Sequence, residues 1–344
     1  MRAIVYGAGF FWKYHRYLLP VDTEIIAYAD SSKTRATRIS GEMIDGKPIL
    51  SPDELKGIEF DTLVIGTDFG TANRIFEILM NMNLNNEVDI RFLARDMKTL
   101  LLSGECVDWH YEVLRNGIIK SRIGDVTMIE KGGSDYDTIS EVFGDCMYHM
   151  SLESDTVLVD IGMNVGYVSL LYAQDKNVVR IYGYEPFPDT YAQALENISL
   201  NSDKIREKII ATNVGLGYGE TQLQVVATTD GTARRSIYTS SGNGEHVEIQ
   251  CCDAGRILTE IINENEGRNI LLKIDTEGAE YDIFKSMEKM NVFEKIYSII
   301  MEYHREPNVL INTLIKHNFR CHFHGFSSQG MLIGMNMNIS ISKH

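Results

Sequence analysis

One short stretch constrains the fold of this chain more than any other: VLVDIGMNVGYVSLLYA, residues 157–173. It begins as an apolar run typical of a buried strand, bends at Gly162, and resumes after Gly166 with apolar residues at helical spacing. In an open α/β sheet, ligands bind beyond the carboxyl ends of the strands, where glycines let the backbone approach the ligand closely. The stretch therefore predicts an α/β fold with a small-molecule site after this strand.

Further apolar runs downstream have the same form, because each ends in a polar or acidic residue. They are VVRIYGYE, KIIATNVG, NILLKID and IYSIIMEYH. With the first run they predict five parallel strands that share one functional edge. Two later runs, FRCHFHGF and MLIGMNMNISI, are joined by a short polar link that contains Gly330. This pair predicts an antiparallel hairpin that closes a mostly parallel sheet.

The chain is long enough, at 344 residues, for two ordinary domains. Its first hundred residues alternate strand-like and helix-like stretches, with helices expected over Lys13–Leu19 and Thr71–Met82. We therefore expect a small Rossmann-like α/β domain over residues 1–100. Residues 101–344 are expected to form the larger domain, with 101–150 as a lead-in segment of mixed character.

Composition excludes several classes of partner. A formal charge of −15 makes nucleic acid an unsuitable partner, because nucleic-acid binding depends on clustered Lys and Arg. No apolar run is long enough for a membrane span and no signal peptide is recognised, so a cytoplasmic location is expected. The cysteines form no CxxC pair, which indicates reduced thiols and no structural zinc. They are Cys106, Cys146, Cys251, Cys252 and Cys321.

Two acids stand where a ligand is expected. Asp160 precedes the glycine bend, whose spacing differs from that of the GxGxxG dinucleotide fingerprint. Its carboxylate would repel a pyrophosphate and attract an ammonium or sulfonium group. Glu185 ends the next strand, at a distance suited to accepting both ribose hydroxyls of a nucleoside. Either acid alone is equally typical of a capped tight turn, but the pair favours a positively charged nucleoside.

Four motifs in order resemble the FkbM family of S-adenosylmethionine-dependent methyltransferases. They are VLVDIGMNVGYVSLLYA, IYGYEPFPDTYAQALENISLN, NILLKIDTEGAEYDIF and IIMEYH, and the resemblance covers roughly residues 132–304. It implies a class I methyltransferase fold with S-adenosylmethionine as cofactor. It also implies a set of cofactor-binding residues, namely Asp160, Gly162, Asn164, Gly166, Glu185, Pro186, Asn213, Val214 and Gly215.

Within that set, the resemblance places the ribose on Glu185 and the adenine beside Asn213–Gly215. One departure from the family is Met163, where a small residue is usual. We expect the longer side chain to narrow the cleft without abolishing binding.

Methyl transfer is an in-line displacement on a sulfonium, so the enzyme must align the acceptor and, for a hydroxyl, remove its proton. The last strand tips deliver acids and bases for this purpose, and we expect Asp275, His304 and Lys273 to be catalytic. His304, with an ordinary pKa near 6.5, is the expected general base, and Asp275 its orienting or metal-binding partner. The alternative is that Glu302 and His304 only cap their strand and hydrogen-bond Lys273.

Asp275, Glu302 and His304 together could also hold Mg²⁺ or another divalent cation. Carboxylates at strand tips are common without a metal, so no metal is included in the expected site. The later Cys321, His322 and His324 are interpreted as structural residues.

The lead-in segment EKGGSDYDTISEVFGDCMYH resembles the segment that in such enzymes folds over the cofactor. On that basis Asp135, Glu141 and Tyr148 are candidate cofactor contacts. A solvated connecting helix with a capping Asp or Ser is an equally good interpretation.

The N-terminus has a glycine turn of its own, Gly7 to Gly9 after a strand, with Asp30 closing the next strand. Trp12 replaces the third glycine of the dinucleotide fingerprint, which argues against an NAD-linked reaction. GKPILSPDEL, residues 46–55, resembles small Rossmann-like domains attached to bacterial sugar-modifying enzymes. This resemblance implies either that the domain holds a nucleotide-sugar or glycan acceptor, or that it only packs on the catalytic domain.

Together these observations predict a two-domain methyltransferase that moves the methyl group of S-adenosylmethionine to a hydroxyl of a sugar, nucleotide-sugar or glycan precursor. Two alternatives remain: a non-catalytic or NAD-linked nucleotide-binding protein, and an N-methyltransferase acting on an amino sugar. The sequence leaves open the acceptor and the oligomeric state, a homo-oligomer included.

Overall fold

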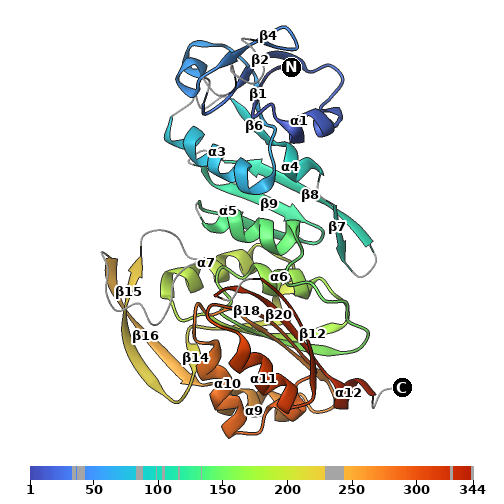
Figure 1. Cartoon of the computed structure of the whole chain (residues 1–344), viewed down its shortest axis with the longest axis vertical. Helices are drawn as coiled ribbons and strands as arrows, with labels where there is room; N and C mark the ends of the chain where they lie inside the picture. Colours follow the sequence, from blue (N-terminus) through green and yellow to red (C-terminus); the bar gives the residue numbers. More distant parts are fainter. Residues whose placement is uncertain are drawn as a thin grey trace. The chain divides into compact units, whose positions relative to one another are not determined.

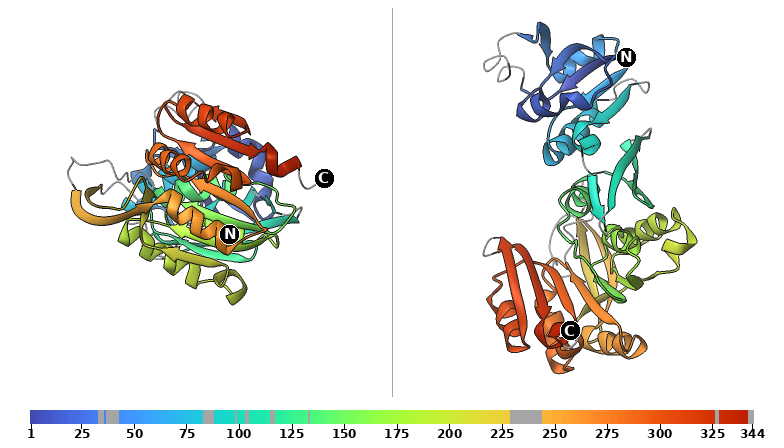
Figure 2. Two further views of the ribbon diagram at one scale, coloured as in Figure 1. Left: turned by 90° about the horizontal axis from the view of Figure 1, so that it is seen from below. Right: turned by 90° about the vertical axis from the view of Figure 1, so that its right-hand side faces the viewer.

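The computed structural model describes residues 1–32, 36, 43–82, 88–97, 99–102, 105–114, 117–132, 134–228, 244–325 and 328–341. The chain divides into two compact units, each shown in Figures 1 and 2. The first comprises Met1–Leu101, Glu105–Gly124 and Ile129–Asp145. The second comprises Leu102–Gly104, Asp125–Met128 and Cys146–His344. Among the described residues, none of the helices is both long and apolar enough to cross a membrane.

The first unit contains a six-stranded sheet in the order β3-β4-β2-β1-β5-β6. All neighbouring strands are parallel except β3 and β4. The strands are β1 (Arg2–Tyr6), β2 (Glu24–Ala29), β3 (Met43–Ile44), β4 (Lys47–Leu50), β5 (Thr62–Ile65) and β6 (Asp89–Phe92). This is the Rossmann-like architecture that the alternation of the first hundred residues predicts.

The helices of this unit begin earlier than the sequence predicts. The expected helix over 13–19 is α1 (Phe10–His15), followed by a 3₁₀ turn, Arg16–Leu18. The expected helix over 71–82 is α3 (Phe69–Asn81), because Asp68 caps it by accepting a hydrogen bond from the Thr71 backbone N–H. A short helix, α4 (Leu93–Met97), follows β6.

The contacts divide the chain differently from the boundary expected at residue 100. A four-stranded sheet, order β10-β9-β8-β7, and helix α5 (Ser134–Ile139) follow α4. The Arg95 guanidinium lies 2.6 Å from the buried Glu130 carboxylate, and Tyr136 packs edge-on against Phe76. Because these contacts join most of 105–145 to the first hundred residues, that part of the lead-in belongs to the first unit. The strands are β7 (Thr99–Leu102), β8 (Glu105–Val113), β9 (Ile119–Ile123) and β10 (Val126–Glu130).

The second unit is built on a seven-stranded sheet in the order β13-β12-β11-β17-β18-β20-β19. The first five are parallel, and β20 pairs antiparallel with both β18 and β19. This confirms the predicted five parallel strands and the closing hairpin. The strands are β11 (Thr156–Ile161), β12 (Val178–Tyr184), β13 (Ile209–Thr212), β17 (Asn269–Ile274), β18 (Ser298–Tyr303), β19 (Phe319–Gly325) and β20 (Gly330–Asn336).

Helices cover both faces of this sheet (Figure 1). One face packs its apolar side chains, such as Val159 and Leu272, against α9, α10 and α11 in a continuous buried core. Helices α6 and α7 lie on the opposite face. The bounds are α6 (Tyr167–Ala173), α7 (Pro188–Ser199), α8 (Asp203–Arg206), α9 (Ala254–Glu264), α10 (Glu280–Lys289), α11 (Asn308–Lys316) and α12 (Met337–Ile341).

A smaller three-stranded sheet, order β14-β16-β15, stands beside the main sheet and was not predicted. It consists of β14 (Gly215–Gly217), β15 (Thr221–Thr228) and β16 (Gly244–Asp253). β15 and β16 pair antiparallel, and β14 is parallel to β16. Its importance for the site is that β14 follows β13 directly and brings Gly215 and Leu216 to the carboxyl edge of the main sheet.

Candidate functional site

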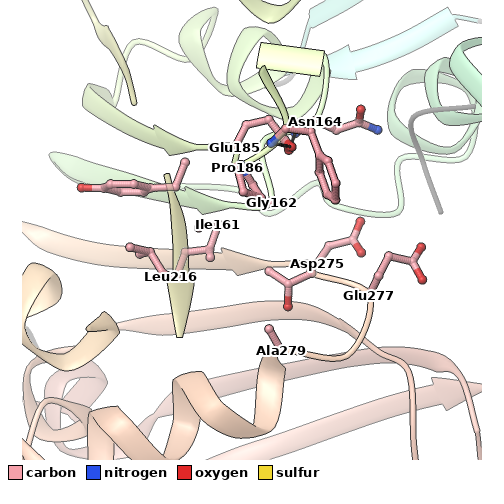
Figure 3. A pocket seen from close by; sticks show the side chains of 13 residues that line it. Ile161, Gly162, Asn164, Glu185, Pro186, Leu216, Asp275, Glu277 and Ala279 are labelled. Carbon is pink, nitrogen blue, oxygen red and sulfur yellow. Dashed lines mark hydrogen bonds between the residues drawn. The ribbon is translucent and has the colours of Figure 1, made fainter. Parts of the chain in front are cut away.

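A cavity lies at the carboxyl edge of the second unit's sheet, as the strand pattern predicts (Figure 3). The segments after β11, β12 and β17 and the strand β14 form its wall. The lining residues are Ile161, Gly162, Asn164, Tyr184, Glu185, Pro186, Phe187, Gly215, Leu216, Asp275, Thr276, Glu277 and Ala279. Of the cofactor residues expected from the sequence, the cavity is lined by Gly162, Asn164, Glu185, Pro186 and Gly215.

The bend at Gly162 requires glycine for two independent reasons. Its φ of +77° lies in the left-handed region that side chains disfavour. A Cβ at this position would also lie 1.8 Å from the carbonyl oxygen of Asp275. The absence of a side chain therefore lets the turns after β11 and β17 touch, and this contact sets the floor of the cavity.

Glu185 is fixed in place before any ligand arrives. Its Oε2 accepts a hydrogen bond from the Asn164 backbone N–H and its Oε1 one from the Phe187 backbone N–H, each at 3.0 Å. The residue is 5% exposed and lines the cavity. Asn213 does not line the cavity; instead its Nδ2 donates to the carbonyl oxygens of Glu185 and Pro186, at 2.8 and 3.1 Å. Asn213 thus holds the turn that presents Glu185.

Two other expected cofactor residues also support the site from outside the cavity. Gly166, with φ +88°, precedes α6 and faces Ala194 of α7, so it serves helix packing. Val214 packs against the buried core. Gly215, by contrast, lines the cavity, and a Cβ there would lie 2.9 Å from Cys251 Sγ.

The structure places Met163 differently from the expectation that it narrows the cleft. Met163 is buried and is not among the cavity's lining residues. A Cβ at Gly183 would lie 2.2 Å from its Sδ, so the long side chain occupies the space left by that glycine on β12. The longer side chain of Met163 is therefore accommodated in the core beside Gly183.

Asp160 is wholly buried and does not line the cavity. Its Oδ2 accepts a hydrogen bond from Ser169 Oγ at 2.7 Å, and its Oδ1 lies 3.2 Å from Lys273 Nζ. The expectation that Asp160 faces the ligand is therefore not met: its charge is neutralised below the cavity floor. The positive partner of Asp160 is therefore Lys273 of the neighbouring strand β17, and not the positive group of a ligand.

Lys273 is a structural clamp in this arrangement and not a proton acceptor. Its Nζ donates to the Gly162 carbonyl oxygen at 2.5 Å and is buried with the side chain. Burial lowers the pKa of Lys273, but the Asp160 and Asp275 carboxylates outweigh burial and raise that pKa above its ordinary value. The ammonium therefore keeps its proton, and a catalytic role for Lys273 stays a prediction.

Replacing Lys273 with methionine is expected to lower the free energy of unfolding by about 3 kcal/mol, because the Asp160 carboxylate would remain buried without its counter-ion. The double variant Lys273→Met/Asp160→Asn should recover part of the loss. Urea denaturation of the three proteins measures both effects. A Lys273→Met protein as stable as the original would contradict the clamp.

Asp275, Glu277, Glu302 and His304 form what we call the acidic cluster. Asp275 and Glu277 line the cavity, and Glu302 and His304 come from the end of β18. His304 Nε2 lies 3.4 Å from Glu277 Oε2, 3.9 Å from Asp275 Oδ1 and 4.0 Å from Glu302 Oε1. The sequence expectation that Asp275 and His304 meet at one edge is thereby confirmed, and Glu277 is the member that was not selected.

The charges of the acidic cluster determine which of its members carry a proton. Burial lowers the pKa of His304, but the hydrogen bond that its ring N–H donates to Glu280 and the charges of Glu277 and Asp275 outweigh burial and raise the pKa to about 9. His304 is therefore protonated at neutral pH in the absence of a ligand. Burial raises the pKa of Glu277 to about 7, and burial with the Asp275 charge raises the pKa of Glu302. The carboxylates are thus better suited to accept a proton than the imidazole.

Tyr148, from the lead-in segment, contacts the acidic cluster directly. Its hydroxyl lies 2.9 Å from Asp275 Oδ2 and 3.2 Å from Glu302 Oε2, so its single proton is shared between two carboxylates. Gln329 Nε2 donates to the other oxygen of Glu302 at 2.7 Å. The other candidates of the lead-in, Asp135 and Glu141, belong to the first unit, where Asp135 accepts a hydrogen bond from the Lys131 backbone N–H.

The N-terminal glycine turn and Trp12 are closely packed within the first unit. Gly7 has φ +83°, and a Cβ there would lie 2.3 Å from Thr67 Cγ2. Trp12 is 3% exposed and packs edge-on against Tyr28, so the residue that replaces the third glycine is part of the core.

Comparison with known proteins gives two family matches. Residues 160–321 match the family model described as Methyltransferase FkbM domain, and residues 1–88 match the one described as C2185-like, N-terminal. The curated methyltransferase sdnD of Sordaria araneosa is 22% identical over 187 residues, which cover 47% of this chain and 72% of that protein.

Two solved structures are similar to part of this chain. Precorrin-6y C5,15-methyltransferase from Geobacter metallireducens has a TM-score of 0.33 and 11% identity, covering 56% of this chain and 86% of its own. TrmK of M. capricolum in complex with S-adenosyl-homocysteine has a TM-score of 0.30 and 14% identity, covering 54% of this chain and 65% of its own.

Proposed function

We propose that this chain transfers the methyl group of S-adenosylmethionine to a hydroxyl of a sugar, nucleotide-sugar or glycan precursor. Its residues 160–321 form a methyltransferase domain of the FkbM family. Methyl transfer from S-adenosylmethionine is the activity of the domain; the acceptor class is our proposal. The observation that carries it is a single cavity with Glu185 at one side and the carboxylates of Asp275 and Glu277 at the other.

The donor side follows from the position of Glu185. Each carboxylate oxygen accepts one backbone N–H, and a carboxylate oxygen can accept more than one hydrogen bond, so Glu185 is suited to accept the ribose hydroxyls as well. We assign Pro186 and Leu216, which both line the cavity, to the faces of the adenine ring. Asn213 holds the turn from behind. Because these groups are fixed by the fold, little side-chain ordering is needed when the cofactor binds.

The acceptor side is the acidic cluster. An acceptor hydroxyl placed there attacks the methyl carbon in line with the sulfur; the new C–O bond forms as the C–S bond breaks, and sulfur keeps the bonding electron pair. The products are the methyl ether and S-adenosylhomocysteine. The hydroxyl proton passes to a carboxylate of the acidic cluster, where burial raises the pKa of Glu277 to about 7 and burial with the Asp275 charge raises that of Glu302.

A sugar suits this arrangement because neighbouring hydroxyls can each donate to a different carboxylate. Asp275, Glu277 and Glu302 supply several acceptor oxygens within a small space around His304. The same negative charge attracts an ammonium group, so N-methylation of an amino sugar is the second candidate. An amine loses its proton more readily than an alcohol and depends less on the proton acceptor.

A screen with methyl-labelled S-adenosylmethionine tests the acceptor class. Matched pairs of sugars that differ only by hydroxyl or amine at one carbon, free and nucleotide-linked, separate the two candidates. We expect label on a hydroxyl oxygen, and we expect Asp275→Asn to reduce the turnover at least about 100-fold, since it removes a carboxylate at the reacting hydroxyl. Glu294→Gln, an exposed residue of the same unit, is the matched control. Label on amines alone would contradict the hydroxyl proposal.

For the first unit, the two roles suggested by the sequence stay predictions: holding the nucleotide-sugar or glycan acceptor, or packing on the catalytic domain. A cytoplasmic location and the absence of a nucleic-acid partner likewise stay predictions of the composition.

A further inference from the structure

The acidic cluster contains a set of side chains with the spacing of metal ligands. One ligand atom from each of Asp275, Glu277 and His304 lies within 4.8 Å of the other two. Two ligands on one ion at about 2.1 Å are at most about 4.2 Å apart, so side-chain shifts of roughly half an ångström would complete the site. We propose that these three side chains bind one divalent cation, Mn²⁺ by preference, beside the acceptor hydroxyl.

The orientation of His304 is the first support for this site. Its Nδ1 lies 3.1 Å from Glu280 Oε1, which directs Nε2 toward the carboxylates of the cluster. Nε2 is buried and has no hydrogen-bond partner among the residues that the structure describes. Metal-ligating histidines commonly donate the other ring N–H to a carboxylate, which fixes the ring and leaves one nitrogen for the ion.

Hydrogen bonds fix the Glu280 carboxylate, which in turn orients His304. It is fully buried, and its Oε1 accepts hydrogen bonds from the Thr276 backbone N–H and hydroxyl and from the Gly278 backbone N–H, at 2.9–3.1 Å. The imidazole is therefore oriented by a carboxylate that is itself fixed by the turn after β17. That turn also carries Asp275 and Glu277, so two of the three ligands and the carboxylate that orients the third belong to the same segment.

The charge of the region is the second support. Five carboxylates lie within 4.0 Å of Lys273 Nζ or of His304: those of Asp160, Asp275, Glu277, Glu280 and Glu302. Lys273 is engaged with Asp160 and the Gly162 carbonyl, so it neutralises the cluster only in part. Like charges this close in a partly buried site are unfavourable unless a counter-charge joins them. A divalent cation supplies that charge.

The ligand types select among cations. Carboxylate oxygens suit Mg²⁺, Ca²⁺ and Mn²⁺, whereas imidazole suits later transition metals. A site with two carboxylates and one imidazole suits Mn²⁺, which accepts both ligand types, better than Mg²⁺ or Ca²⁺.

The role of the cation rests on the proposed methyl transfer. A hydroxyl that coordinates a divalent cation becomes more acidic, so its proton leaves more readily as the C–O bond forms. Glu302 is outside the ligand set, and its carboxylate lies 4.0 Å from His304 Nε2.

A titration with Mn²⁺ tests the site. The full chain is first treated with a chelator, and the electron paramagnetic resonance signal of the free ion then shows how much Mn²⁺ is bound. We expect one tightly bound Mn²⁺ per chain, with Asp275→Asn and His304→Gln each weakening binding at least about 100-fold. Glu280→Gln, which leaves all three ligands in place, should weaken binding about 10-fold to 100-fold. Glu294→Gln, an exposed acid of the same unit, should bind as tightly as the original.

A second measurement does not depend on the folding of any variant. Pulsed electron paramagnetic resonance of the bound Mn²⁺ should show coupling to an imidazole nitrogen. Absence of tight binding, bound Mn²⁺ without nitrogen coupling, or equal affinity in His304→Gln would overturn the proposal. Calorimetry of the same chelator-treated protein with S-adenosylmethionine separates the metal proposal from the proposed methyltransferase function. If the protein binds the cofactor but not Mn²⁺, the metal proposal is wrong and the methyltransferase proposal stands.

Discussion

Replacing Glu185 with alanine is expected to weaken the binding of S-adenosylmethionine at least about 100-fold. The carboxylate is proposed to accept both ribose hydroxyls, and hydrogen bonds to a charged group contribute about 1.5–3 kcal/mol each. The change also leaves the backbone N–H groups of Asn164 and Phe187 without their present partners. Isothermal titration calorimetry measures the dissociation constant, and circular dichroism checks that the variant is folded.

Two further variants make the Glu185 result specific. Glu185→Gln keeps the shape but turns an NH₂ toward one of the two backbone N–H groups, so its affinity should fall between those of the original and Glu185→Ala. Glu294→Ala removes an exposed acid of the same unit and should bind like the original. If Glu185→Ala keeps its affinity while folded, the cofactor does not sit on this carboxylate.

Replacing Gly162 with alanine is expected to reduce the free energy of unfolding by about 3 kcal/mol or more and to abolish cofactor binding. The left-handed backbone alone costs about 1–2 kcal/mol with a side chain. The larger effect comes from the Cβ, which would lie 1.8 Å from the Asp275 carbonyl oxygen. A main-chain oxygen cannot rotate away, so the turns after β11 and β17 must separate. Thermal and urea denaturation measure the loss.

The matched control for Gly162 is Gly217→Ala in β14. Gly217 has no positive φ, and a Cβ there meets nothing within 4 Å. We expect a change in stability within about 1 kcal/mol and unchanged cofactor affinity. A Gly162→Ala protein as stable as Gly217→Ala would show that the two turns do not touch as described.

The main sheet was predictable because its central strands are largely apolar and are followed by polar residues. β11 and β17 are buried at every position, which is the pattern of a central parallel strand. The three-stranded sheet was missed because its pairing is non-local: β15 and β16 are separated by residues 229–243, and β14 is only three residues long. Neither feature gives a periodic signal in a short window.

The boundary between the two units was missed for a similar reason. The Arg95–Glu130 ion pair and the Phe76–Tyr136 ring contact join segments far apart along the chain. Composition along the lead-in does not reveal which neighbour a buried arginine or tyrosine will find.

Within the site, the sequence located the right turns but not the direction of every side chain. Glu185 lines the cavity as predicted, whereas Asp160 points below the floor, because Ser169 and Lys273 offer it buried partners there. Strand alternation cannot distinguish a carboxylate that faces a ligand from one that faces a lysine on the adjacent strand.

The role of His304 could not be derived from its type alone. An isolated imidazole near pKa 6.5 is a suitable base, but Glu280 and the surrounding carboxylates raise its pKa to about 9. Glu280 lies on α10 and reaches His304 only in the folded chain. Its signal in the sequence was present in TEGAE, where the acid follows the turn by two residues, yet only the fold shows which group it holds.

The central claim is that the cavity binds S-adenosylmethionine through Glu185. The most direct test is calorimetry of the original full chain and of Glu185→Ala, each with S-adenosylmethionine and with NAD. We predict that the original binds one S-adenosylmethionine per chain and no NAD, and that Glu185→Ala binds S-adenosylmethionine at least about 100-fold more weakly and no NAD. Binding of NAD in preference to S-adenosylmethionine, or equal S-adenosylmethionine affinity in the two proteins, would contradict the assignment of this cavity.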